Sequence, residues 1–128
     1  MTYEIEHKAN RIIIFRMLPG YHFDNDAAKA QGEVATLLDS IKTQPIFLIT
    51  DFSRIQMSFG DLVMKLGNNT HGRKGSISDP RVKNIFVGTD ELVNLAAESL
   101  YQTQYGKLPT LVFTTMSEAL TYAEAMLI

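Results

Sequence analysis

IFLITDFSRIQMSFGDL, residues 46–62, contains the change of pattern that decides the fold. It begins with the apolar run Ile46–Thr50, which has the length and composition of a buried strand. Ser58 and Asp61 then stand three residues apart, the spacing of a helix cap, and an apolar pattern of helical spacing starts at Leu62. The stretch therefore predicts a buried strand, a turn and a helix in succession.

The same alternation extends toward the N-terminus. Residues 3–6 and 11–17 are two extended runs, the second rich in β-branched side chains, and together they predict a hairpin. Asp24 or Asp26 is suited to accept a hydrogen bond from the free amides at the start of a helix that we expect to end near Thr43.

Toward the C-terminus the strand-helix unit occurs twice more. Residues 82–88 and 108–113 predict strands, and residues 89–106 and 114–127 predict helices. Strands separated by helices of this length imply a mainly parallel sheet covered by helices. We therefore expect one α/β domain over residues 1–128, a mixed but mostly parallel sheet of about five strands with four helices, in the order β-β-α-β-α-β-α-β-α.

Composition narrows the classes of function. The chain of 128 residues is 45% apolar, which suffices for one core, and its formal charge of -2 lacks the basic surplus that binds nucleic-acid phosphates. It contains no cysteine, which excludes disulfides and thiolate chemistry. The first residues lack a basic segment followed by a long apolar run, and no stretch reaches the roughly 20 apolar residues of a membrane span. We expect a cytoplasmic protein that binds no nucleic acid and does not span a membrane.

One stretch carries a resemblance to a known family. Asp51-Phe52-Ser53 ends the predicted third strand, and Met57-Ser58-Phe59-Gly60-Asp61-Leu62 leads into the next helix. With the order of elements, this resembles the STAS, or anti-sigma-factor-antagonist-like (SpoIIAA-like), domains. In that family an Asp-Ser-Ser-Gly-Leu-like element carries a serine that partner kinases phosphorylate. Here the spacing is one residue shorter, the acidic residue follows the glycine, and a single serine is present. The resemblance implies a STAS-like fold and a candidate switch or ligand site at Asp51, Ser53, Ser58 and Gly60.

Each of these residues also has a purely structural interpretation. The Ser58 hydroxyl and the Asp61 carboxylate have the spacing to cap a helix, whereas a phosphate on Ser58 would benefit from the amides and dipole of the same helix start. Asp51 stands where open α/β sheets place ligand-binding groups, yet an aspartate there also stops a strand by forming an Asx turn. Capping and the turn are the favoured interpretations, and capping is compatible with a switch.

A second candidate site lies in a predicted loop. Residues 68–80 lack periodicity, and between residues 70 and 83 four basic residues stand against one acidic residue, a local charge of +3. His71, Arg73 and Lys74 are our candidates for binding an anion or an acidic partner, and an ordinary solvated loop is the alternative.

The remaining patterns argue against catalysis. The three histidines, His7 in a predicted hairpin turn and His22 and His71 in loops, lack the spacing of metal ligands, and no acid, base and nucleophile converge. We expect no catalytic residue, metal or cofactor. The favoured function is a non-enzymatic regulatory or interaction module that binds a protein partner or a small anionic or apolar ligand. A small-ligand, lipid-like carrier is the alternative, with the Ser58 helix start receiving the head group, and an enzyme of unrecognised type is third. Homo-oligomerisation is left open.

Overall fold

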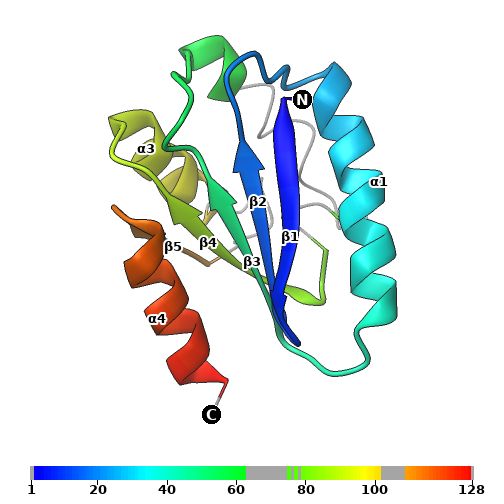
Figure 1. Ribbon diagram of the computed structural model, residues 1–128. Coiled ribbons are helices and arrows are strands. Elements are labelled where there is room, and N and C mark those ends of the chain that lie inside the picture. The colour runs from blue at the N-terminus through cyan, green and yellow to red at the C-terminus, as the bar shows by residue number, and fades with distance from the viewer. Residues whose placement is uncertain (1, 63–74, 76, 78, 102–108, 128) are drawn as a thin grey trace.

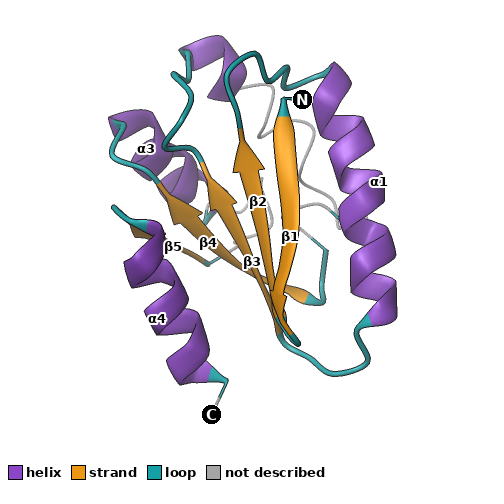
Figure 2. Cartoon of the chain, in the orientation of Figure 1, coloured by secondary structure: helices purple, strands orange, loops and turns teal. Residues whose placement is uncertain are grey.

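A five-stranded sheet forms the centre of the molecule in the computed structural model (Figures 1 and 2). The structure describes residues 2–62, 75, 77, 79–101 and 109–127. The strands lie side by side in chain order: β1 (Tyr3–Ala9), β2 (Ile12–Met17), β3 (Ile46–Asp51), β4 (Val82–Val87) and β5 (Thr110–Phe113). β1 pairs antiparallel with β2, and every later pair is parallel. The predicted α/β class and the mostly parallel sheet are confirmed.

The helices cover both faces of this sheet. They are α1 (Asn25–Ser40), α3 (Glu91–Leu100) and α4 (Met116–Met126), and a fourth, here called the Phe59 helix, begins at Phe59 and is described as far as Leu62. Side chains of α1, α3 and the Phe59 helix share one core with β2 and β3, while α4 packs on the opposite face through Ala119 and Ala123. Right-handed crossovers between neighbouring parallel strands place α1, α3 and the Phe59 helix on the same face.

The burial pattern explains why the apolar runs in the sequence are continuous. In β2, Ile13 and Phe15 face α1, whereas Ile12 and Ile14 face α4, and all four side chains are buried. β3 is buried at every position. A strand with a helix layer on each face has no solvent-facing side, so its sequence shows no alternation.

Several boundaries differ from the sequence prediction, and the largest difference is at α3, which ends at Leu100 rather than near residue 106. β1 reaches Ala9 rather than ending near residue 6, with a register shift between His7 and Ala9, so His7 lies in a strand and not in the hairpin turn. α1 ends at Ser40, short of the expected Thr43, because Ile41 is already extended. Asp24 caps α1, and Asp26 instead accepts hydrogen bonds from the His22 amide and the Thr2 hydroxyl, which lower its pKa.

Candidate functional site

The parallel strands β2, β3 and β4 have their carboxyl termini at the same end of the sheet. Asp51 is the last residue of β3 at this end. Its side chain is buried, and its Oδ1 accepts a hydrogen bond from the Ser53 amide at 2.8 Å. This is the geometry of an Asx turn, so the structural interpretation of Asp51 is confirmed. Ser53 contributes its backbone amide to this turn, and its side chain is exposed.

Ser58 and Asp61 form the expected helix cap. The Asp61 amide donates to the Ser58 Oγ at 3.1 Å, and the Ser58 amide donates to the Asp61 Oδ2 at 3.1 Å. The Leu62 amide donates to the Ser58 carbonyl at 3.1 Å, which is the first backbone bond of the Phe59 helix. Two free amides at the helix start thus satisfy their hydrogen bonds through each other's side chains. Ser58 and Gly60 are exposed, so this cap faces solvent.

Phe59 lies at the same end of the sheet, and it was not among the candidate residues predicted from the sequence. Its side chain is 68% exposed, more than any other large apolar side chain that the structure describes. Met57 and Leu62 on either side of it are buried, so the chain turns the aromatic ring outward while its neighbours enter the core. The available signal was its position: a large aromatic residue directly after a cap serine precedes the apolar helical pattern and does not belong to it.

A groove of about 290 Å³ lies next to the cap. One wall is the connection between β2 and α1, with Pro19 and Tyr21, and the other follows β3, with Arg54 and Ile55. Asp61 of the cap also lines it. Tyr21 is fixed by edge-to-face contacts with Phe23 and Phe15, with ring centroids 5.1 and 5.8 Å apart, so the first wall is held against the core. Burial, and secondarily the Asp26 carboxylate, raise the pKa of Tyr21.

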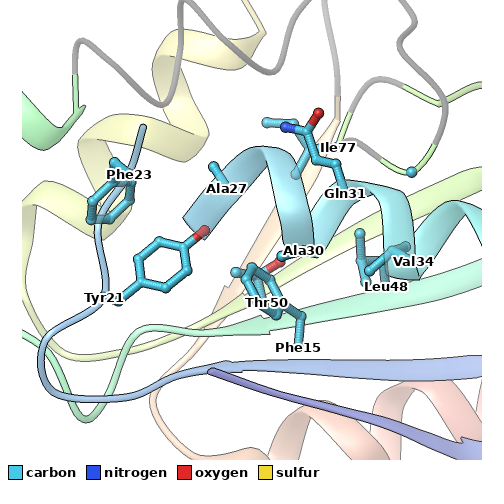
Figure 3. Close-up of a pocket in the computed structure, with 11 residues that line it drawn as sticks. Phe15, Tyr21, Phe23, Ala27, Ala30, Gln31, Val34, Leu48, Thr50 and Ile77 are labelled. Atoms are coloured by element: carbon cyan, nitrogen blue, oxygen red, sulfur yellow. The ribbon is translucent and has the colours of Figure 1, made fainter. Parts of the chain in front are cut away.

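A separate small pocket lies between α1 and the sheet (Figure 3). Its volume is about 20 Å³, room for about one water molecule. Phe15 and Thr50 form its floor and Ala30 and Val34 of α1 its roof. The Thr50 Oγ1 is fully buried and has no hydrogen-bond partner in the described part of the chain. A pocket of this size has no room for the acyl chain of a lipid, and the carrier hypothesis, with its head group at Ser58, stays a prediction.

The second candidate site is only partly described. His71, Arg73 and Lys74 lie outside the described residues, and their role stays a prediction. Arg81, which we counted in the local positive charge, is held by carboxylates: Nη2 donates to Asp79 Oδ2 at 2.8 Å and Nη1 to Asp39 Oδ1 at 2.7 Å. These hydrogen bonds raise the pKa of Arg81. Its charge is therefore compensated within the molecule, and Arg81 does not contribute an unpaired cation to the loop.

Asp79 also holds the end of this loop against α1. Its side chain is 2% exposed and accepts from the Gly75 amide at 2.9 Å as well as from Arg81. Burial alone would raise the pKa of Asp79, but these hydrogen bonds outweigh it and the pKa is lowered. Gly75 has a positive φ of 78° and packs so closely that a Cβ there would lie 2.0 Å from the Gln31 carbonyl oxygen. Only glycine fits this contact.

Metal-binding clusters of side chains are absent from the described residues. These residues contain no group of three or more His, Asp or Glu side chains that could hold a metal ion. Ser58 forms hydrogen bonds with Asp61 and Leu62. The His7 ring forms a hydrogen bond with the Asn10 carbonyl. No helix among the described residues is long and apolar enough to cross a membrane.

Comparison with known proteins identifies the fold. The structure is similar to that of the anti-sigma factor antagonist SpoIIAA in its unphosphorylated form, with a TM-score of 0.59, 14% sequence identity and coverage of 96% of each chain. The sequence matches no model of a known protein family, and it matches no protein with a curated description. The fold is therefore STAS-like, as the resemblance implied, and the similarity at this identity concerns the fold alone.

Proposed function

We propose that this protein is a non-enzymatic regulatory module that binds a protein partner. The binding surface lies at the carboxyl end of the parallel strands and carries Ser58 and Phe59. The observation that carries the proposal is the exposure of Phe59, 68% of whose side chain is accessible on a capped helix start. A partner that covers the exposed part of Phe59 would recover about 1 to 2 kcal/mol, which is roughly two thirds of the free energy gained when such a side chain is fully buried. The proposal includes a cytoplasmic location and a function without a cofactor.

The surroundings of Phe59 support a protein partner more than a small ligand. The groove of about 290 Å³ beside the cap has apolar walls at Pro19 and Ile55 and charged rims at Arg54 and Asp61. An aromatic anchor next to a shallow groove with a charged rim is the usual anatomy of a protein interface. The similar solved structure is that of an anti-sigma factor antagonist, which supports a regulatory role for this fold.

Ser58 is our candidate for a phosphorylation switch at this interface. A phosphate on its Oγ would lie beside the Asp61 side chain, because the Asp61 amide is 3.1 Å from that oxygen and the Asp61 carboxylate is bonded to the Ser58 amide. Two like charges in this position repel each other, whereas the helix amides attract the phosphate. Phosphorylation would therefore rearrange the cap directly next to Phe59. Asp51 and Ser53 act in this proposal by fixing the turn that leads to the cap.

The test is affinity capture from a lysate of the native host with matched variants. Phe59→Ala should lose a protein that the wild type retains, because truncation of a central aromatic anchor typically costs about 2 kcal/mol or more of binding free energy. Tyr101→Ala is the control, since Tyr101 is an aromatic residue of similar exposure, 62%, in the C-cap of α3. Equal capture by wild type, Phe59→Ala and Tyr101→Ala would refute the proposal.

A further inference from the structure

A larger cleft lies on the other face of the sheet, at the opposite ends of the strands. Its volume is about 400 Å³, and it is formed where β4 and β5 begin, with Phe47 of β3 and Tyr122 of α4 completing it. The ladder between β4 and β5 starts at Asn84 and Thr110, so Val82 and Lys83 precede the paired region on one side of the cleft. Neither Ser58 nor Phe59 lines it.

The walls of this cleft are mainly apolar and well fixed. The Tyr122 ring meets the Phe47 ring edge to face, with centroids 6.2 Å apart and planes at 89°. Ile85 is buried on this face and pairs in register with Leu111, whose side chain is 45% exposed. An exposed leucine beside a buried isoleucine, in a cleft that a tyrosine also lines, gives an incoming apolar group a surface to cover.

Lys83 provides a positive charge at the rim. It pairs directly with Phe47 in the parallel ladder between β3 and β4, so both side chains project from the same face of the sheet. Lys83 is exposed and forms no ion pair within the described residues. Among the described residues that line the cleft, none is acidic.

We propose that this cleft binds a small amphipathic anion with a flat apolar body. The body would lie between Tyr122 and Leu111 over Phe47, and the anionic group would face Lys83. Small-molecule sites are typically clefts of roughly 300 to 1,000 Å³ with apolar walls and few polar groups, and the volume and lining found here fall within that description. The inference is independent of the proposed partner interface, which lies at the other end of the strands.

The test uses two probes of nearly the same shape, 1-naphthoate and the neutral 1-naphthalenemethanol, titrated into the full chain at low salt. Binding is followed by the amide NMR signals of the ¹⁵N-labelled protein. We expect saturable shifts around Lys83, Leu111 and Tyr122 with both probes, and tighter binding of the anion. Raising the salt concentration should reduce the difference between the two probes, because it screens the exposed lysine.

Matched variants separate the charge from the apolar surface. Lys83→Gln should weaken naphthoate about two- to fivefold and leave the alcohol unchanged, whereas Lys83→Arg should retain the preference for the anion. Leu111→Asn should weaken both probes about fivefold, since it removes exposed apolar surface. Lys8→Gln, in the edge strand β1, is the control and should change neither affinity.

Several results would overturn the proposal. Failure of both probes to saturate, or shifts centred away from the cleft, would show that the cleft is not a site for this chemistry. Lys83 has no role as the anion partner if Lys83→Gln weakens the affinity for naphthoate and for the alcohol equally. The same conclusion follows if Lys8→Gln and Lys83→Gln have equal effects on the affinity for naphthoate. Unchanged binding in Leu111→Asn would remove the role of the apolar floor.

Discussion

Substitution of Ser58 by alanine removes one acceptor from the start of the Phe59 helix. The lost hydrogen bond is the one from the Asp61 amide to the Ser58 Oγ, 3.1 Å long, while the bond from the Ser58 amide to the Asp61 carboxylate uses the backbone and remains. Loss of such a cap costs about 1 kcal/mol of unfolding free energy. For a chain of 128 residues this corresponds to a decrease in melting temperature of about 4 °C.

The assay is chemical and thermal unfolding of a small set of serine variants. Ser53→Ala is the matched control, because the Ser53 side chain is exposed and its hydroxyl has no hydrogen bond among the described residues. It should change stability by less than about 0.5 kcal/mol. Ser58→Asn should recover most of the loss, since an asparagine oxygen also accepts from the helix amides.

Ser58→Asp tests the charge at the same position. Its carboxylate can cap the helix and complements the helix dipole, but it stands next to the Asp61 carboxylate. We expect Ser58→Asp to recover part of the stability that Ser58→Ala loses. The recovery should become complete when Asp61→Asn removes the repulsion between the two carboxylates. If Ser58→Ala and Ser53→Ala unfold identically, the cap does not stabilise the helix start, and the reasoning about Ser58 is wrong.

Three further substitutions, two of them with a matched control, test contacts around α1. Gly75→Ala should destabilise the protein by at least about 2 kcal/mol, since its Cβ would overlap backbone, whereas Gly32→Ala in open space on α1 should stabilise it by up to about 1 kcal/mol in the same denaturant titrations. Asp79→Asn should lower the free energy of unfolding by about 3 kcal/mol, because the Asp79 side chain is buried and paired with Arg81. Asp39→Asn should lower it by less than about 1 kcal/mol, because the Asp39 side chain is 64% exposed. Because the folded-state pKa of Asp79 lies below its ordinary value of 3.8, its contribution is complete above that pH and is lost as the pH falls further, so wild type and Asp79→Asn should converge in acid. Thr50→Val should leave stability unchanged or raise it by up to about 1 kcal/mol, because the buried hydroxyl has no partner among the described residues, and a lower melting temperature would reveal one.

The sequence was sufficient to predict the α/β class and the mainly parallel pairing of the strands. Continuous apolar runs such as Ile12–Phe15 and Ile46–Thr50 occur where a strand is buried on both faces, and helices between them require parallel pairing. The Ser58 cap and the Asp51 turn were also predictable, because both depend on residues at most three positions apart. Local spacing determines such contacts.

Features that depend on distant residues were not predictable. Arg81 was counted as a free cation. Its ion pair with Asp79 is local, but its other partner, Asp39, is 42 residues away in the chain, and no local pattern relates Arg81 to Asp39. For Phe59 the local signal was weak, because only its position before the apolar pattern that begins at Leu62 separates the exposed phenylalanine from the buried leucine. The volume beneath α1 likewise depends on how closely Ala30 and Val34 approach the sheet, which the order of elements does not specify.

Hydrogen-deuterium exchange of the complex shows whether the partner covers the surface around Ser58 and Phe59. The partner is the protein that both the wild type and Tyr101→Ala capture, and exchange is compared between the free and the bound protein. We expect slower exchange in peptides that cover residues 52–62, which include Ser58 and Phe59, and in the facing connection at residues 18–23. Protection confined to α3, α4 or β5, with residues 52–62 unchanged, would contradict it.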